Sequence, residues 1–388
     1  MELTESASLN AIEKELLSDR YEIGKSTEVQ NNVFLCNAMK NIRVDRKLIS
    51  LDNAFTYYAY GELGMLWIQT PACKNSKHGN CTVCNYWNGN RVSDVVDRVI
   101  GADIHFADEK ILLVNTCGSC LDPYELDYPE QEKLLKWLNG VKHEEIILET
   151  HLNTLDRNTV LKVRELLTDK KVSFEIGVES VSPDVLFYSI NKPFSANRVR
   201  EKLELIHSVN ASCIVNVLMG APFLTKEEQI ADSVVTIKAL LEMGVDSLVL
   251  FPVNIKPHTL PEFLYKEGMY QQIRADMLVK VLEQIPENEL HNVDLSWYGE
   301  HVEKDVIGPY YCPKCQNLLK SLIFDFVFAK TAKERKRILL KMSKQVCTCG
   351  CETGDYFRMS YYERLKTGYD LIRKKVVPKN SIVKDCLQ

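Results

Sequence analysis

The sequence lacks a hydrophobic run long enough to cross a membrane. Its most apolar stretch, residues 322–329, is short and contains Asp325, whereas a membrane-spanning helix needs about 20 apolar residues. The N-terminus is acidic and includes neither the basic start nor the apolar segment of a secretion signal. These absences predict a cytoplasmic protein that has no membrane partner.

The sequence also lacks an excess of basic residues. The 388 residues include 48 Lys and Arg against 53 Asp and Glu, so the formal net charge is −5. A chain with this balance is not expected to bind nucleic acid strongly and non-specifically. Residues 330–337 and 373–379 are locally basic, and we interpret both segments as solvent-exposed faces.

Cysteine, in contrast, is abundant, with 13 residues. In a reduced compartment, grouped cysteines more often bind metals or serve redox chemistry than form structural disulfides. Cys36, Cys213 and Cys386 stand alone, and we interpret them as packing or surface residues. The others fall into groups, at positions 73, 81 and 84; 117 and 120; 312 and 315; and 347, 349 and 351.

The segment from residue 70 to residue 87 contains the first group, Cys73, Cys81 and Cys84. It has no fourth cysteine, and His78 is the only other soft ligand in it. Structural zinc usually has four protein ligands, whereas three thiolates bind three irons of a cubane cluster and leave the fourth iron open. The spacing therefore favours an iron–sulfur cluster, with a zinc site as the alternative.

Six short runs rich in Val, Ile and Leu predict strands that are buried on both faces of a parallel sheet. These runs are Met65–Gln69, Ile111–Asn115, Ile146–Glu149, Val172–Val178, Cys213–Met219 and Ser247–Phe251. Helical patterns follow four of the runs, at residues 129–140, 157–167, 196–208 and 226–243, and Thr225 with Glu228 predicts a capping box. The predicted fold class is α/β, with a partial (β/α)6 TIM-like barrel, because a full barrel needs eight strands.

The chain divides into three predicted regions. Residues 1–60 form an N-terminal helical extension, because apolar residues between positions 9 and 17 recur at helical spacing. Residues 61–288 form the barrel core. Residues 289–388 form a small Cys-rich C-terminal lobe, with one helix predicted at residues 318–342 between its two groups of cysteines.

Polar residues follow all six predicted strands, at the end of the sheet where parallel α/β folds bind ligands. Glu179 stands out, because a carboxylate at the end of an apolar strand needs a partner. Glu149, His151 and Lys192 are candidate residues of a substrate pocket.

These stretches resemble the radical S-adenosylmethionine (SAM) superfamily, whose members place a three-cysteine loop after the first strand of a partial (β/α)6 barrel. The usual loop has three residues between its first two cysteines, whereas seven separate Cys73 from Cys81. The longer spacing is similar to that of the branch that groups the Elongator catalytic subunit with the archaeosine-forming enzymes, and the chain resembles the second group more. The similar segments are 73–86, 117–122, 175–180, 190–194, 222–225 and 251–254 with Thr259, together with the late cysteines.

The resemblance implies that Cys73, Cys81 and Cys84 bind a [4Fe-4S] cluster whose open iron binds SAM. One electron, from a donor such as flavodoxin or ferredoxin, would then cleave SAM to methionine and a 5′-deoxyadenosyl radical that abstracts hydrogen from the substrate. The residues implied to contact SAM are Gly118, Ser119, Glu179, Ser180, Asn216 and Asn254. The implied reaction cleaves a C–N bond in a lysine-modified 7-deazaguanine base of tRNA, as a lyase or transferase, with the tRNA bound through a partner protein.

Two alternatives remain open. The same radical chemistry would suit a small metabolite, nucleotide or peptide, because Thr150–Asn153 and Gly220–Ala221 depart from the family at expected substrate contacts. A non-catalytic zinc protein that binds nucleic acid is the other alternative. The catalytic residues are not identified by the sequence, and Cys117, His151 and Lys192 are the candidates.

The C-terminal cysteines predict a second metal site. Cys312 and Cys315 form a Cys-Pro-x-Cys turn, and Cys347 and Cys349 supply two further thiolates. Four thiolates suit a structural zinc ion, with a second iron–sulfur cluster or unmetallated thiols as alternatives. Cys351 is a spare or substitute ligand.

Overall fold

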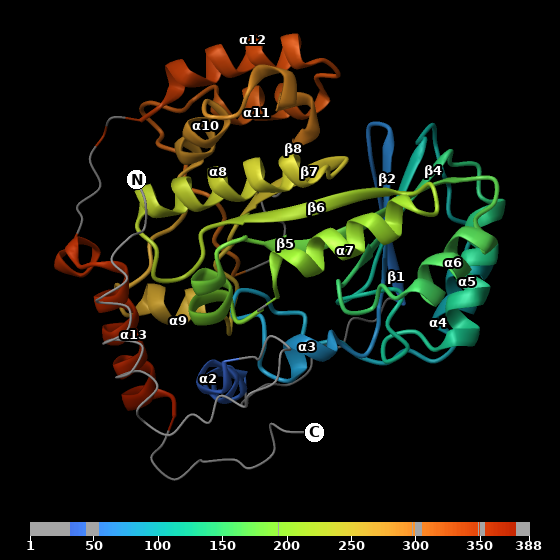
Figure 1. Ribbon diagram of the computed structural model, residues 1–388, viewed down its shortest axis with the longest axis horizontal. Helices are drawn as coiled ribbons and strands as arrows, with labels where there is room; N and C mark the ends of the chain where they lie inside the picture. The colour runs from blue at the N-terminus through green and yellow to red at the C-terminus, as the bar shows by residue number, and fades with distance from the viewer. Residues whose placement is uncertain are drawn as a thin grey trace.

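The computed structural model describes residues 32–43, 54–192, 194–296, 298, 305–347, 349 and 354–377. Among these residues, eight strands form one sheet in sequence order, from β1 to β8. The sheet curls into an open half-barrel with helices packed on its outer side (Figure 1). The apolar residues that predict the N-terminal helical extension, between positions 9 and 17, lie outside the described residues.

The strands β2 to β8 are parallel to one another. β1 (Phe55–Tyr60) is the exception and runs antiparallel to β2 (Leu63–Ile68). The later strands are β3 (Ile111–Asn115), β4 (Glu145–Thr150), β5 (Lys171–Glu179), β6 (Ser212–Met219), β7 (Ser247–Pro252) and β8 (Val293–Leu295). All six predicted strands are present, so the prediction of an α/β partial barrel is confirmed.

The prediction of six strands is too low by two. β1 lies in residues that we assigned to the helical extension, and that assignment is wrong for residues 55–60. This strand forms an edge of the sheet and half of it is exposed, so it has no long apolar run to mark it. β8 has only three residues, too few for a periodic pattern, and it carries the sheet into the region predicted as the C-terminal lobe. The division of the chain at residues 60 and 288 stays a prediction.

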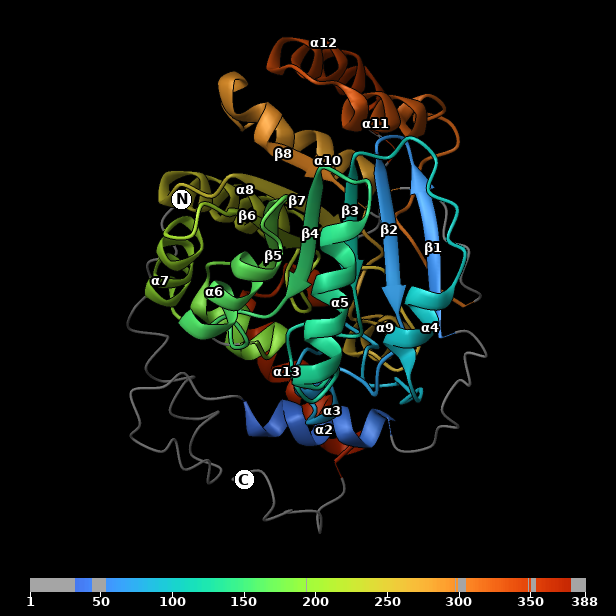
Figure 2. The ribbon, with the colours of Figure 1, turned by 90° about the vertical axis from the view of Figure 1, so that its right-hand side faces the viewer.

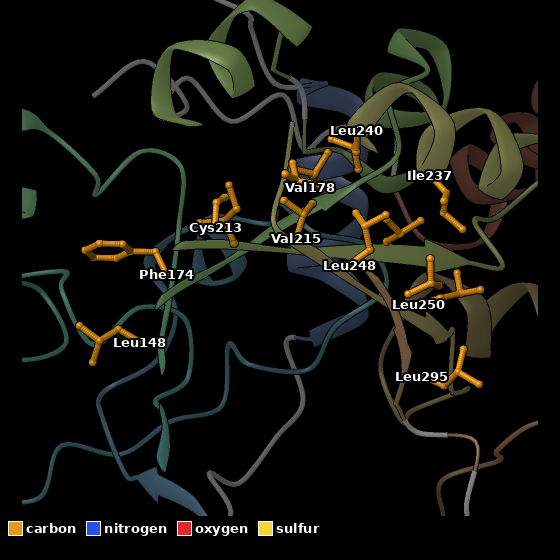
Figure 3. Close-up of a cluster of buried hydrophobic side chains, with 14 of the residues drawn as sticks. Leu148, Phe174, Val178, Cys213, Val215, Ile237, Leu240, Leu248, Leu250 and Leu295 are labelled. Carbon is orange, nitrogen blue, oxygen red and sulfur yellow. The ribbon is translucent and has the colours of Figure 1, made fainter. Parts of the chain in front are cut away.

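Helices connect the parallel strands and bury the outer face of the sheet. They are α4 (Val95–Gly101), α5 (Tyr128–Gly140), α6 (Arg157–Leu166), α7 (Ala196–His207), α8 (Lys226–Met243) and α10 (Ala275–Leu282). α9 (Leu260–Lys266) instead belongs to a second apolar cluster, with Phe34 and Tyr369. The capping box of Thr225 and Glu228 at the start of α8 is confirmed. Figure 3 shows part of the core, where Ile237 and Leu240 of α8 lie near Leu248 of β7. In the described part of the chain, no helix combines the length and the apolar character needed to span a bilayer.

The single helix predicted at residues 318–342 is wrong. Two helices occupy this stretch, α11 (Leu319–Phe328) and α12 (Ala332–Met342). α11 ends at Phe328, with Ala329 as its C-cap, and Thr331 starts α12, because its side chain forms a capping box with Glu334. The buried Arg335 of α12 donates to the carbonyls of Leu290 and Val293, at 2.9 and 2.7 Å. Arg335 thus attaches α12 to the β8 edge of the sheet.

The two ends of the half-barrel carry different elements. The helices α2 (Val33–Arg43), α3 (Lys74–Lys77) and α13 (Tyr361–Lys375) lie at one end, and α11 and α12 lie at the other (Figures 1 and 2). In Figure 2 the arrowheads of β2 and β4 point towards α3. The three-cysteine segment therefore lies at the carboxyl ends of the strands, where ligands bind in such folds.

Candidate functional site

The segment 70–87, called the cysteine loop below, folds tightly after β2. The amide of Cys73 donates to the carbonyl of Tyr86 at 2.9 Å and closes the loop. Gly79 and Cys81 have φ angles of 93° and 55°, left-handed conformations that let the chain reverse within a few residues. Cys73 and Cys81 are buried, and Cys84 is partly exposed.

Two distant segments hold the cysteine loop in place. The amides of Cys81 and Thr82 donate to the carbonyls of Asn191 and Ile190, at 3.2 and 2.9 Å. The amide of Leu260, at the start of α9, donates to the carbonyl of Thr82 at 2.9 Å. The loop is thereby fixed against residues that follow β5 and β7.

Arg43, at the end of α2, supplies a buried positive charge beneath the loop. Its guanidinium donates to the carbonyls of Cys81 and Cys84, at 3.2 and 3.3 Å, and to that of Ser76. It also lies 5.8 Å from the ring centroid of Trp87. Burial lowers the pKa of Arg43 below its usual value, and the charges of four nearby cysteines, Cys84, Cys81, Cys73 and Cys36, offset this only in part. The sequence analysis missed Arg43, because nothing in α2 indicates that it reaches a loop almost 40 residues away.

The thiols of the loop differ in acidity. A hydrogen bond from Cys81, together with the charge of Arg43, lowers the pKa of Cys84 to about 5. The hydroxyl of Ser76 lies 3.3 Å from the same sulfur. The pKa of Cys81 is raised well above its usual value, because its thiol is the donor in that pair and is buried. Burial raises the pKa of Cys73 to about 12. Cys84 is therefore the more acidic thiol of this pair.

The turn at Gly118 and Ser119 lies directly against Cys73. A Cβ added to Gly118 would lie 2.7 Å from the Sγ of Cys73 and 2.6 Å from the Oε1 of Glu125, so only glycine fits here. The hydroxyl of Ser119 is fully buried and lies 2.6 Å from that of Thr150. The side chain of Ser119 thus packs inside the protein, and a contact of this residue with SAM would come from its backbone.

Glu125 holds this turn and was missed by the sequence analysis. It accepts hydrogen bonds from the amides of Gly118 and Ser119, at 3.0 and 2.9 Å, and from the hydroxyl of Thr70, at 2.7 Å. Burial raises the pKa of Glu125 to about 7. Its place seven residues after a Gly-Ser turn was the available signal. The carboxyl fixes the backbone beside Cys73.

Two thiols near the turn are engaged with the backbone. The Cys117 thiol donates to the carbonyl of Thr70 at 3.7 Å, and burial raises its pKa to about 11. The Cys120 thiol donates to the carbonyl of Glu149 at 3.5 Å. Both residues are buried, which agrees with packing and gives Cys117 no special acidity.

His151 and Lys192 lie beside the cysteines. The Nε2 of His151 is 3.3 Å from the Sγ of Cys73, and burial with the charge of Lys192 lowers the pKa of His151 to about 3. The Nζ of Lys192 donates to the Oε1 of Glu179 at 2.7 Å. Burial lowers the pKa of Lys192, but the charges of Glu179 and Cys81 raise it above its usual value. Lys192 is therefore a cation next to the loop.

Glu179 and Ser180 end β5 in different surroundings. Glu179 has a φ of 67° at an irregularity of the ladder with β6, and its buried Oε2 has no hydrogen-bond partner. A Cβ added to Gly177 would lie 2.5 Å from both the Oε1 of Glu179 and the Nζ of Lys192. Ser180 is fully buried and its hydroxyl donates to Asp232 at 2.8 Å. Of these two residues, Glu179 retains an oxygen that a ligand hydroxyl would satisfy.

Four polar side chains lie on neighbouring strands of the barrel. Glu149 of β4 is in register with Glu175 of β5, which the sequence analysis missed, and Asn216 of β6 is in register with Gly177. Burial, and then the charge of Glu175, raise the pKa of Glu149 to about 8, whereas a hydrogen bond from Asn115 lowers it. Burial also raises the pKa of Glu175. Two carboxyls this close favour a shared proton or a bound cation.

Asn254 lies after β7, and only 5 % of it is exposed. Its Oδ1 has no hydrogen-bond partner. A buried amide oxygen of this kind is usually paired, so a donor from a ligand would suit the position.

The C-terminal cysteines form a compact group. The sulfurs of Cys312, Cys315, Cys347 and Cys349 all lie within 4.8 Å of one another, and those of Cys315 and Cys349 are 3.4 Å apart. Tetrahedral zinc, with bonds to sulfur of about 2.3 Å, places its sulfurs about 3.8 Å apart. A cubane cluster separates its cysteine sulfurs further, because each binds a different iron. Cys351 lies outside the described residues.

The cysteine loop is built differently. Among the described residues, its three sulfurs do not form such a compact group. Three thiols that do not converge on one point, with the cations of Arg43 and Lys192 close by, fit a [4Fe-4S] cluster better than a structural zinc ion.

No protein-family model matches the chain. Three curated proteins are similar in sequence. An uncharacterized protein of Methanocaldococcus jannaschii is 21 % identical, over 72 % of this chain and 80 % of its own length. The archaeosine synthase subunit beta of Thermococcus kodakarensis is 26 % identical, over 53 % of this chain and 66 % of its own. The subunit beta of Methanosarcina acetivorans is 22 % identical, over 64 % and 73 %.

The solved structures that match this chain do so with low TM-scores. The archaeal Elp3 of Methanocaldococcus infernus is 14 % identical with a TM-score of 0.39, and the match covers 52 % of this chain and 50 % of that one. Coproporphyrinogen III oxidase of Escherichia coli, a radical SAM enzyme, is 14 % identical with a TM-score of 0.40, over 79 % and 66 %. The proteins that this chain is similar to thus include archaeosine synthase subunits beta by sequence and, by structure, Elp3 and a radical SAM enzyme, at low identity in both comparisons.

Proposed function

We propose that this chain is a radical SAM enzyme whose [4Fe-4S] cluster is held by Cys73, Cys81 and Cys84. The observation that carries the proposal is the convergence of three segments on one buried loop at the carboxyl ends of the strands. Gly118 and His151 follow β3 and β4, Lys192 follows the helical turn Val185–Ile190 after β5, and all three lie near these cysteines. When bound, the cluster and SAM would supply a 5′-deoxyadenosyl radical for hydrogen abstraction.

Other residues of the chain would hold the loop in place, balance its charge and bind SAM. Arg43 holds the loop carbonyls, and Lys192 offsets the negative charge of the thiolates. The Oε2 of Glu179 and the Oδ1 of Asn254 are buried acceptors without partners, and they suit hydroxyl and amino donors of SAM. The close packing of Gly118 on Cys73 leaves its backbone as the surface that a ligand would meet.

The test is formation of 5′-deoxyadenosine by anaerobically reconstituted and reduced protein with SAM. The wild-type chain should form it, and Cys81→Ala should not. Cys213→Ala is the control, because Cys213 is buried in the apolar core on β6. A Cys81→Ala variant that still forms 5′-deoxyadenosine would exclude the assigned ligands.

For the substrate, we propose a lysine-modified 7-deazaguanine base in tRNA, with C–N bond cleavage and a partner subunit that binds the tRNA. Two of the relatives are named archaeosine synthase subunit beta. The paired carboxyls of Glu149 and Glu175 suit the ammonium group of a lysine adduct. A small electron-transfer protein such as flavodoxin or ferredoxin is the proposed electron donor.

A small metabolite that carries an ammonium group is the second candidate, because the same two carboxyls suit it and the chain is acidic overall. tRNA from cells that make the lysine adduct should accelerate formation of 5′-deoxyadenosine, and added salt should reverse this effect. An enzyme that is indifferent to this tRNA at low salt would support the small molecule instead.

For the C-terminal lobe, we propose a single tetrahedral zinc ion bound by Cys312, Cys315, Cys347 and Cys349. The spread of the four sulfurs supports one ion rather than a cubane cluster. Protein purified in air should contain about one zinc per chain, and Cys315→Ser should lose it. Iron in place of zinc after anaerobic reconstitution would support the second cluster.

A further inference from the structure

His151 lies next to Cys73, although the two residues follow strands that are not neighbours in the sheet. It follows β4, whereas the cysteine loop follows β2, and β3 lies between them. The Nε2 of His151 nevertheless lies 3.3 Å from the Sγ of Cys73. This approach is possible because the turn after β3 has glycine at position 118, which leaves the sulfur uncovered.

The backbone of His151 is fixed by its own turn. The amide and the hydroxyl of Thr154 both donate to the carbonyl of His151, at 3.0 and 2.9 Å. The hydroxyl of Thr154 also lies 2.8 Å from that of Thr150 and 3.0 Å from that of Ser119. These bonds hold the backbone from which the ring of His151 reaches Cys73, which suits a permanent contact.

The direction of the hydrogen bond follows from the chemistry of a metal-bound cysteine. A thiolate has no proton to donate, so it only accepts hydrogen bonds, and the Nε2 of His151 must carry the hydrogen. The conclusion does not depend on the charge of the ring, because both a neutral Nε2–H tautomer and an imidazolium donate at this atom.

We propose that His151 is a positioning residue that donates a hydrogen bond to Cys73 and makes the cluster easier to reduce. The inference rests on the proposed function, because it needs a cluster on Cys73. Hydrogen bonds to cysteine sulfurs and net charge set the reduction potential of iron–sulfur clusters. Reduction adds negative charge to the cluster and its thiolates, so a donor in a buried site stabilises the reduced form more than the oxidised form.

The test is a potentiometric titration of the reconstituted cluster, followed by the electron paramagnetic resonance signal of its reduced form. His151→Leu should lower the midpoint potential by about 59 mV, which for a one-electron couple is about a tenfold fall in the ratio of reduced to oxidised cluster at a fixed solution potential. His151→Gln keeps an N–H donor and should retain most of the wild-type potential. His105→Leu is the control, because His105 is exposed between α4 and β3, outside the cysteine loop, and should not change the potential.

Three results would overturn the proposal. The first is a His151→Leu protein with a full complement of iron and the wild-type potential. The second is loss of one iron from the cluster in His151→Leu, which would make His151 a ligand. The third is a wild-type protein that binds no cluster, and in that case the proposed function fails as well. If leucine prevents folding, His151→Ala removes the same donor with a smaller side chain and carries the same expectation.

Discussion

The two groups of cysteines offer the same ligand atom in different surroundings, although each includes buried and partly exposed members. In the cysteine loop, Cys73 and Cys81 are buried and lie near the charged groups of Arg43 and Lys192. In the C-terminal lobe, Cys349 is exposed and the four sulfurs are within 4.8 Å of one another. Ligand number, spacing and buried charge therefore distinguish a site suited to redox chemistry from one suited to a structural ion.

The two cysteine sites also lie at opposite ends of the half-barrel. The cysteine loop lies at the carboxyl ends of the strands, where several connections meet. The lobe cysteines flank α11 and α12, at the opposite end of the half-barrel. A metal in the lobe would cross-link two ends of a helical pair, whereas one in the loop would face the interior of the barrel.

Reciprocal cysteine variants give the largest expected effect. Cys84→Ala should lose all cluster iron and keep the lobe metal, because Cys84 is the acidic thiol of the loop. Cys315→Ala should lose the lobe metal and keep the cluster iron. Metal analysis of both reconstituted variants measures this. If either variant loses both metals, the two sites are coupled and the comparison does not hold.

Gly118→Ala should have the next largest effect. The added Cβ would lie 2.7 Å from the Sγ of Cys73, and such overpacking costs about 1–3 kcal/mol. We expect lower cluster iron with an unchanged lobe metal. Gly140→Ala is the matched control, because nothing lies within 4 Å of a Cβ at that position. Equal iron contents in the two variants would contradict the close packing of the turn.

Glu125 should make the stability of the buried site depend on pH. Its pKa is raised from 4.5 to about 7 by burial, so the folded chain retains the proton to a higher pH than the unfolded chain. The stabilisation is present below pH 4.5 and is lost as the pH rises to about 7, by about 3 kcal/mol. Glu125→Gln should flatten this part of the curve, measured by urea unfolding of the metal-free protein.

Glu132→Gln is the control for this experiment. The side chain of Glu132 on α5 is 42 % exposed, and hydrogen bonds from Lys136 and Lys162 lower its pKa. It therefore titrates below the pH range in which Glu125 is expected to act. An unchanged slope in Glu125→Gln would show that the carboxyl does not titrate as its burial requires.

The sequence predicted the parts of this molecule that local patterns encode. Apolar runs gave six parallel strands, and the spacing of Cys73, Cys81 and Cys84 gave the candidate cluster loop. Glu175 lies within an apolar strand and was not singled out, because its importance comes from its register with Glu149 on the neighbouring strand. Arg43 was missed for the same kind of reason, since its contacts join residues far apart in the chain. Contacts that only the folded chain creates leave no periodic signal.

Thr331→Ala should have the smallest effect, and it tests whether the C-terminal lobe and the cysteine loop are independent of each other. Its side chain accepts from the amide of Glu334 at the start of α12, and loss of such a cap costs about 1 kcal/mol. Thr331→Ala should therefore loosen α12 and weaken zinc retention against a chelator by a few-fold. Cluster iron should not change, because Arg335 still ties α12 to the sheet through the carbonyls beside β8. Chelator-induced zinc release and iron content, measured on the same samples, check both expectations, and a parallel loss of iron would mean that the lobe supports the cysteine loop.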